Sequence, residues 1–243
     1  MKNYELIAYS QPRSFITESF RTLRANLQFL GVGDTLKTVL LAGGGFGEGT
    51  SFITANLGIV FAQMGCRVVV VDCDLRKPQQ HLIFNVDNQF GLTSILTGLK
   101  EHGEVLKTLP VGGVRVLTAG PLPANPTELL GSRQMGRLIA NLKESADVIL
   151  MDAPPMAVVA DAAVLSKGVD GVLMVVRSMV ASRDSVIKTK ELLANARARI
   201  LGVALNCARM GEVSEDYYNY YAESPKIGQK KRKIAEGTEK AAG

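Results

Sequence analysis

Short, strongly hydrophobic runs alternate with longer segments of helical spacing through the middle of the chain. The run at 67–72 contains four consecutive valines, which is typical of a parallel strand buried on both faces. The segment 51–64 instead has apolar residues at helical spacing. Strands separated by helix-length segments predict a parallel α/β sheet with right-handed crossovers. We expect strands at 38–42, 67–72, 114–118, 147–152, 170–177 and 199–206.

An amphipathic helix is expected at 15–30, ahead of the first strand, with Ser14 as its cap. Its apolar positions follow one another at steps of four and three; they are Ile16, Phe20, Leu23, Leu27 and Leu30. Glu18, Arg21 and Arg24 lie on the other face at steps of three. From composition alone, this is a charged face exposed to solvent. A further helix is expected from Ser182 to about residue 197.

Composition and cysteine count exclude several classes of protein. The chain has 243 residues, of which 47% are hydrophobic and 21% charged, so it can bury a sizeable core. The sequence contains no apolar run of about 18 residues, so it predicts no membrane-spanning helix. Cys66, Cys73 and Cys207 are too few and too scattered for a disulfide framework or a zinc knuckle. We therefore expect a reduced, cytoplasmic protein.

The net charge of +5 is concentrated at one end of the chain. Residues 225–243 carry +4, because six basic residues stand there against two glutamates. This basic tail is either a solvated end or a segment attracted to anionic lipid headgroups or to an acidic partner. Nucleic-acid binding is not expected, because no basic stripe continues into the body.

The most informative segment is the glycine-rich stretch at 41–51, which follows an expected strand and opens an expected helix. Such a turn directs backbone N–H groups and a helix N-terminus at one point, which suits a phosphate chain. Its spacing matches the P-loop pattern G-x-x-x-x-G-K-[ST], except that threonine replaces the lysine. A structural glycine turn is the alternative for this segment taken alone. The candidate nucleotide-binding residues are Gly44, Gly45, Phe46, Gly47, Glu48, Gly49, Thr50, Ser51 and Phe52.

Three aspartates follow the carboxyl ends of expected strands. Asp72 and Asp74 come after the valine run, and Asp152 ends the strand at 147–152. Ligands of open α/β sheets bind at this edge, and Mg²⁺ would relieve the repulsion between the carboxylates. Each aspartate alone is more often a cap or a turn former. Together with the glycine-rich loop, the three predict a nucleotide–Mg²⁺ site.

The ordered set of motifs resembles the bacterial tyrosine kinases of capsular and exopolysaccharide synthesis, specifically the cytoplasmic kinase of the two-protein systems. The resemblance covers roughly residues 8–221. Its motifs are GEGxS at 47–51, VVDxDLRKP at 70–78, GLTSILTG at 91–98, GPLPANPTELL at 120–130, the Walker B segment at 148–155, VDGVLMVVR at 169–177 and a tyrosine cluster near the end.

The resemblance implies a P-loop NTPase-like, mostly parallel sheet with helices on both faces, and it implies ATP and Mg²⁺ as ligands. The loop would cradle the ATP phosphates, with the Ser51 hydroxyl on Mg²⁺. Asp72 and Asp74 would hold or orient Mg²⁺, and one of them would accept the proton of a tyrosine hydroxyl. Asp152 would complete the Mg²⁺ environment. Asn206 matches an asparagine that contacts the base in related ATPases.

The family also implies self-association. Glu18-x-x-Arg21-x-x-Arg24 matches its subunit-interface motif, which reverses the simple interpretation of the charged face and predicts a ring-like homo-oligomer. The tyrosine cluster would be phosphorylated by the neighbouring subunit; its members are Tyr217, Tyr218, Tyr220 and Tyr221. We expect an oligomerisation segment at 1–35, a kinase domain at 36–210 and a flexible tail at 211–243. A membrane polysaccharide co-polymerase is the implied activator, and it would recruit the kinase to the inner face of the membrane.

Two positions depart from the family pattern. Thr50 stands where the lysine is expected, and Phe52 stands where a small hydroxyl residue is usual. Arg76 and Lys77 are cations that follow the second Walker segment, and the sequence leaves open whether either substitutes. Three hypotheses therefore remain: an autophosphorylating tyrosine kinase, a nucleotide-binding pseudokinase of the same family, and a MinD/ParA-type positioning ATPase. The last expects a lysine early in the loop, where this chain has Gly45.

Overall fold

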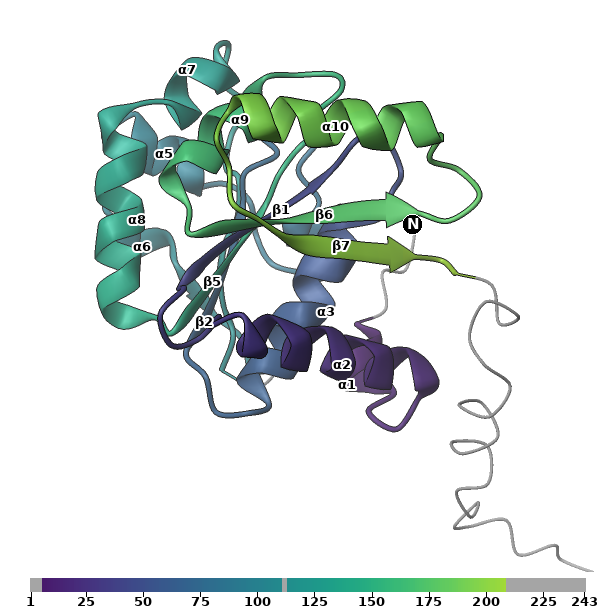
Figure 1. Cartoon of the computed structure of the whole chain (residues 1–243). Coiled ribbons are helices and arrows are strands. Elements are labelled where there is room, and N and C mark those ends of the chain that lie inside the picture. Colours follow the sequence, from purple (N-terminus) through teal and green to yellow (C-terminus); the bar gives the residue numbers. More distant parts are fainter. Residues whose placement is uncertain (1–5, 111–112, 209–243) are drawn as a thin grey trace, which may run out of the picture. The chain divides into compact units, whose positions relative to one another are not determined.

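A seven-stranded sheet carries helices on both of its faces (Figure 1). The computed structural model describes residues 6–110 and 113–208. The spatial order of the strands is β3-β4-β2-β5-β1-β6-β7, and every neighbouring pair is parallel except β3 and β4. The strands are β1 (Thr38–Gly43), β2 (Val68–Asp72), β3 (Lys107–Thr108), β4 (Arg115–Leu117), β5 (Val148–Asp152), β6 (Gly171–Arg177) and β7 (Ile200–Asn206). The expected fold class is confirmed.

The six strands expected from the hydrophobic runs are present, and β3 is the addition. It has two residues and pairs antiparallel with β4 at one edge of the sheet. A two-residue strand has no run of apolar positions, so the hydrophobic pattern gave no signal for it.

Helices of very different lengths connect the strands. They are α1 (Ile7–Ser10), α2 (Phe15–Phe29), α3 (Thr50–Ala62), α4 (Gln80–Ile83), α5 (Leu92–Leu96), α6 (His102–Val105), α7 (Pro126–Leu130), α8 (Arg133–Ser145), α9 (Asp161–Leu165), the 3-10 helix η1 (Ser166–Gly168) and α10 (Arg183–Asn195). Within the described ranges, no helix is long and apolar enough to cross a lipid bilayer.

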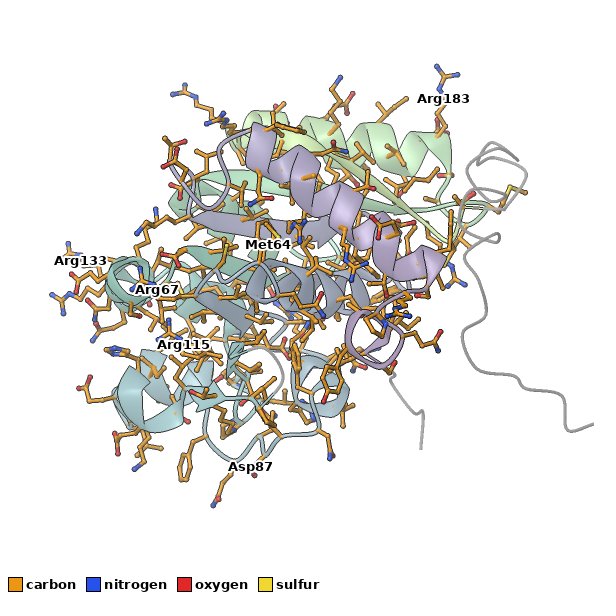
Figure 2. All side chains as sticks on the ribbon, turned by 90° about the horizontal axis from the view of Figure 1, so that it is seen from below. Met64, Arg67, Asp87, Arg115, Arg133 and Arg183 are labelled. Carbon is orange, nitrogen blue, oxygen red and sulfur yellow. The ribbon has the colours of Figure 1, made fainter. Side chains whose placement is uncertain are left out.

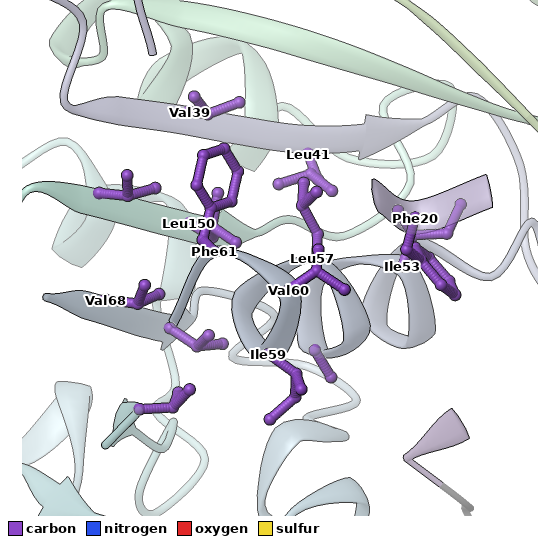
Figure 3. Close-up of a cluster of buried hydrophobic side chains, with 14 of the residues drawn as sticks. Phe20, Val39, Leu41, Ile53, Leu57, Ile59, Val60, Phe61, Val68 and Leu150 are labelled. Atoms are coloured by element: carbon purple, nitrogen blue, oxygen red, sulfur yellow. The ribbon is translucent and has the colours of Figure 1, made fainter. Parts of the chain in front are cut away.

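Two hydrophobic cores lie on the two faces of the sheet. On one face, Phe20 of α2 and Leu57 and Phe61 of α3 pack with strand residues that include Leu41 and Leu150 (Figure 3). On the other face, α8, α9 and α10 cover the sheet (Figure 1). Residues 6–208 thus belong to one compact unit, in which α2 shares a core with the sheet.

Helix α3 lies between the sheet and the helices α1 and α2. Every residue from Ile53 to Ala62 is buried, as expected for a helix that is apolar on all sides. Asn56 is a polar exception, and its side-chain oxygen accepts a hydrogen bond from the Ala8 N–H at 2.9 Å. This burial fixes the start of α3, which is also the end of the glycine-rich loop.

The strand register brings two of the predicted site residues together. In the β2–β5 pair, Asp72 lies opposite Asp152, and in the β1–β5 pair Leu41 lies opposite Asp152. Both carboxylates therefore lie at the carboxyl edge of the sheet, next to the point where β1 enters the glycine-rich loop.

Candidate nucleotide-binding site

The glycine-rich loop connects the end of β1 at Gly43 to the start of α3 at Thr50. Gly47 and Gly49 adopt left-handed backbone conformations with φ of 73° and 87°, which glycine adopts without steric cost. At Gly49 a side chain is excluded in addition, because a Cβ there would lie 2.2 Å from Nδ2 of Asn206. The loop can therefore turn sharply into the N-terminus of α3.

A cavity of about 700 Å³ opens beside this loop, within the size range of small-molecule sites. The loop forms one wall from Gly45 to Phe52, the turn after β2 contributes Asp74, and Ala153 follows β5. Every sequence-predicted residue of the loop except Gly44 thus lines one space at the edge of the sheet. Gly44 and the carboxylates of Asp72 and Asp152 are buried and do not line it.

The side chain of Glu48 turns back onto the loop itself. Its side chain is 4% exposed, and Oε2 accepts a hydrogen bond from Gly44 N at 2.9 Å while Oε1 accepts one from Gly45 N at 3.1 Å. The carboxylate thereby satisfies backbone donors of the first half of the loop. Glu48 shapes the loop from within.

Side chains at the carboxyl ends of β6 and β7 donate hydrogen bonds to carbonyl groups of the loop. The Asn206 side-chain amide donates to the Glu48 carbonyl at 2.8 Å, and Arg177 Nη1 donates to the Gly47 carbonyl at 3.0 Å. Asn206 therefore contacts the loop, while its predicted contact with a nucleotide base stays a prediction. Arg177 was not predicted as a site residue, because its motif carries no sign of which way the side chain turns.

The buried carboxylates have different surroundings. Asp72 accepts backbone hydrogen bonds on both oxygens, from Asp74 N at 3.2 Å and from Gln79 N and Gln80 N at 3.0 and 2.9 Å. Asp152 accepts a bond on Oδ2 from the Gln80 side chain at 2.8 Å. Its Oδ1 is buried and has no partner among the described residues. Sequence reasoning missed Gln80, since no pattern distinguishes it from its neighbour.

Burial raises the pKa of Asp152 to about 7 and, together with the charge of Asp152, raises the pKa of Asp72 well above its ordinary value. A hydrogen bond from Ser51 lowers the pKa of Asp152 only in part. Desolvation disfavours charge unless a cation compensates it. Burial and mutual repulsion therefore disfavour two negative charges at this pair, and a bound cation would favour them.

The donor set fits Mg²⁺. The unpartnered Asp152 Oδ1, the Ser51 hydroxyl and the Asp74 carboxylate at the cavity wall supply the oxygen atoms that this ion prefers. Among the described residues, no three His, Cys, Asp or Glu side chains form a complete metal cage. Mg²⁺ commonly keeps several waters and completes its shell with phosphate oxygens, so a partial set is sufficient.

The charged residues of α2 face different surroundings. Glu18 and Arg21 form an ion pair at 2.9 Å and remain partly exposed. Arg24 instead donates to the Val60 carbonyl at 2.9 Å, which satisfies one of the last carbonyls of α3. Figure 2 views this face, and α2 lies across the sheet as its outer helix. Glu18 and Arg21 are thus accessible to another subunit, while Arg24 is engaged within the chain.

Comparison with known proteins agrees with this architecture. The tyrosine-protein kinase YwqD of Bacillus subtilis (strain 168) is 36% identical over 225 residues, which are 93% of this chain and 94% of YwqD. The putative tyrosine-protein kinase CapB of Staphylococcus aureus is 34% identical, covering 90% of this chain and 95% of CapB. The chain belongs to the bacterial tyrosine kinases. The solved structure of the chimerical protein CapA2B2 superimposes on this kinase with a TM-score of 0.79 at 38% identity, over 82% of this chain and 88% of that one.

Broader comparisons place the kinase among the P-loop NTPases. A family model described as "ParA: NUBPL iron-transfer P-loop NTPase" matches residues 35–231. The septum site-determining protein MinD of Pyrococcus horikoshii has a TM-score of 0.61 at 22% identity. That likeness shows the fold alone, whereas the relatives above 30% identity are named tyrosine kinases. The resemblance inferred from the motifs is confirmed at the level of family and fold.

Proposed function

We propose that this kinase is a Mg-ATP-dependent autokinase that regulates capsular or exopolysaccharide synthesis and export. Its substrate would be the tyrosine cluster at Tyr217, Tyr218, Tyr220 and Tyr221, which lies outside the described residues. The observation that carries the proposal is a cavity lined by the P-loop and Asp74, at the sheet edge where the buried carboxylates of Asp72 and Asp152 lie opposite each other. Near-full-length similarity to YwqD and CapB supports the same reaction.

The residues of the site have separable roles in such a reaction. The amides of the second half of the loop and the N-terminus of α3 would bind the phosphate chain, because Glu48 already engages those of Gly44 and Gly45. Bound Mg²⁺ would neutralise charge on the phosphates, held by Ser51 and Asp152 and oriented through Asp72. Asp74 lines the cavity, and its carboxylate would accept the proton of the attacking tyrosine hydroxyl. The tyrosine oxygen gains the γ-phosphoryl group, and the bond to the departing ADP breaks.

Assembly would bring substrate and site together. The partly exposed Glu18–Arg21 pair on α2 supports a contact with a neighbouring subunit, and in a ring each tail would be phosphorylated in trans. Several phosphates on one tail would carry close to two negative charges each. They would weaken docking of the tail into an acidic site and loosen the ring.

A membrane co-polymerase is the proposed activator. The solved structure of the chimerical protein CapA2B2 supports pairing between a kinase of this family and a second protein. The basic segment at 225–243, which lies outside the described residues, would add attraction to anionic lipids. The kinase would then act at the inner face of the membrane.

Thr50 supports a second candidate function, that of a nucleotide-binding pseudokinase. A threonine hydroxyl donates a hydrogen bond but cannot neutralise charge. Losing one preorganised donor from an active site lowers rates by about 10²–10³. In this case the loop and the carboxylates would still bind Mg-nucleotide, but the protein would transfer phosphate poorly. It would then influence polysaccharide synthesis by binding its membrane partner.

The experiment that separates the two candidates is the intact mass of the purified chain after incubation with Mg-ATP, beside a Thr50→Lys version. Phosphates that map to 217–221 on the natural chain support the autokinase. Phosphates on the Thr50→Lys version alone support the pseudokinase. Absence of phosphate from both versions, although both bind Mg-nucleotide, contradicts a self-sufficient autokinase. A version with all four tyrosines changed to phenylalanine is the control for other acceptor sites.

A further inference from the structure

The phosphate-binding loop of this kinase contains no cation of its own. Thr50 occupies the position of the P-loop lysine and lines the cavity with an uncharged hydroxyl. Phosphoryl transfer depends mainly on positioning and on stabilisation of negative charge. A cation that reaches the loop from elsewhere in the chain would restore this stabilisation.

Of the described residues that line the cavity, Arg76 and Lys77 are basic. Arg76 is already committed: its Nε donates to Asp161 Oδ2 at 2.8 Å, and its Nη2 donates to Thr127 Oγ1 at 3.2 Å. Asp161 is fully buried, so withdrawal of Arg76 would leave a buried carboxylate without its cation, which is strongly unfavourable. Arg76 is therefore held away from the loop.

Arg177 is a third cation at the loop, but it acts from the other side. Its guanidinium donates to the Gly47 carbonyl, and Arg177 is not among the residues that line the cavity. Its guanidinium therefore bonds to the backbone of the loop and does not face the cavity.

Lys77 has the opposite arrangement to Arg76. Its Nζ lies 5.3 Å from the centroid of the Phe46 ring, at the tip of the loop. No ion pair engages this ammonium group within the described ranges. The backbone N–H groups of Arg76 and Lys77 both donate to Asp74 Oδ1, at 3.1 and 2.8 Å. One carboxylate thus fixes the turn from which the two side chains leave in different directions.

We propose that Lys77 supplies the positive charge to the nucleotide phosphates that Thr50 cannot supply. The Phe46 ring keeps the ammonium group at the mouth of the loop before a nucleotide binds. A cation over an exposed ring is held weakly, and charge-assisted hydrogen bonds to phosphate are stronger, so the group is free to turn to the phosphates. This inference rests on the proposed nucleotide site, but it concerns binding and stands apart from phosphoryl transfer.

The test is a double-mutant cycle between positions 50 and 77, measured as the dissociation constant of Mg-ATP by titration calorimetry. Four versions are compared: the natural chain, Thr50→Lys, Lys77→Gln and the double variant. Lys77→Gln should weaken binding about 10- to 100-fold in the natural chain, as expected for loss of a hydrogen bond from a charged donor. In the Thr50→Lys background the same change should matter less than about twofold, because the lysine at 50 then supplies the charge.

Two further versions keep the result interpretable. Lys77→Arg retains the charge and should keep most of the affinity. Lys188→Gln removes a cation from α10, away from the cavity lining, and should leave the affinity unchanged. Thermal unfolding of each version shows whether it folds. Equal losses from Lys77→Gln in both backgrounds, or no loss in either, would overturn the inference even if the kinase transfers phosphate. Coupling in binding without phosphotyrosine would support the inference while contradicting the autokinase.

Discussion

The side-chain amide of Gln80 donates a hydrogen bond to Asp152 at 2.8 Å and a second one to the Ser51 carbonyl at 3.1 Å. Gln80 is fully buried at the start of α4, and its backbone N–H also donates to Asp72. One residue therefore connects both strand-end carboxylates to the first turn of α3. This connection sets the position of the carboxylates relative to the loop, so Gln80 acts as a positioning residue.

The first prediction concerns this positioning. Gln80→Leu keeps most of the volume but removes both side-chain hydrogen bonds, which leaves Asp152 less well oriented. Loss of a partner that orients a metal ligand lowers metal affinity by about 10–100-fold. We expect a rise of this size in the Mg²⁺ concentration needed for nucleotide binding. Gln134→Leu, at an exposed position of α8, is the matched control. An unchanged Mg²⁺ dependence in Gln80→Leu would show that Gln80 only packs.

Two glycine motifs that suggested the family have a structural explanation. A Cβ at Gly91 would lie 2.2 Å from the Thr118 carbonyl oxygen and 2.4 Å from Gly120 N. The two segments are joined by a backbone hydrogen bond from Leu92 N to the Thr118 carbonyl at 2.7 Å. The start of α5 and the chain after β4 thus meet backbone to backbone, which only glycine permits.

Replacement of this glycine should be costly. Gly91→Ala forces the two backbone segments apart, and we expect a loss of roughly 2–4 kcal/mol in the free energy of unfolding, within the range of severe overpacking. Gly136 is the control, because it lies inside α8 and a Cβ there meets nothing within 4 Å. Gly136→Ala should stabilise the protein by about 1 kcal/mol through helix propensity. Chemical denaturation measures both, and equal effects would contradict the close approach.

Asp170 connects the starts of two strands across the sheet. Its Oδ2 accepts hydrogen bonds from Lys37 N, Thr38 N and Thr38 Oγ1, each at 2.9 Å, and its Oδ1 accepts one from Lys143 Nζ at 2.9 Å. Burial raises the pKa of Asp170, but these hydrogen bonds outweigh it and hold the pKa at about 2.

The third prediction follows from the sign of this shift. A carboxylate with a lowered folded-state pKa stabilises the protein above its unfolded pKa of 3.8, and this contribution is lost as the pH falls from about 4 to about 2. Asp170→Asn should therefore cost about 1–3 kcal/mol in the free energy of unfolding at pH 7. The difference from the natural chain should shrink below pH 4. Asp34→Asn, at an exposed position, should change stability by less than about 0.5 kcal/mol. A difference that is independent of pH would contradict the assignment.

Much of the architecture and part of the site were predictable. The longer strands and α2, α3 and α10 have periodic patterns of at least five residues, and parallel strands bring their carboxyl ends to one edge. Asp72 and Asp152 were therefore expected to lie close together, and the register confirms it. Helices such as α4 and α7 have four or five residues, which is too short for a hydrophobic period to appear.

The unpredicted parts of the site depend on side-chain direction. Glu48 was predicted as part of the phosphate-binding loop and lines the cavity with it, but no sequence pattern indicated that its carboxylate turns back onto Gly44 and Gly45. Gln80 and Arg177 were missed because their hydrogen bonds join residues far apart in the sequence. Such contacts form only when the loop, the sheet edge and α4 come together in the tertiary structure. Local sequence patterns therefore do not predict them.

The last prediction separates the two arginines of α2. Arg21 pairs with Glu18 on a partly exposed surface, and such pairs contribute at most about 1 kcal/mol. Arg24 bonds the Val60 carbonyl, and its Nε is buried without a partner among the described residues. Arg24→Ala should thus destabilise the isolated subunit by about 1–2 kcal/mol, whereas Arg21→Ala should leave its stability nearly unchanged. If α2 forms the ring contact, both changes should lower the oligomer mass seen by light scattering.

Arg183→Ala is the control for this comparison, because Arg183 begins α10 on the opposite face of the sheet from α2 (Figures 1 and 2). It should change neither the mass nor the stability. Normal assembly of Arg21→Ala would remove α2 from the proposed interface, because the exposed pair is the part of the motif that the fold itself does not require. A loss of assembly in Arg24→Ala alone would instead trace to the weakened junction between α2 and α3, since that variant also loses stability as a monomer.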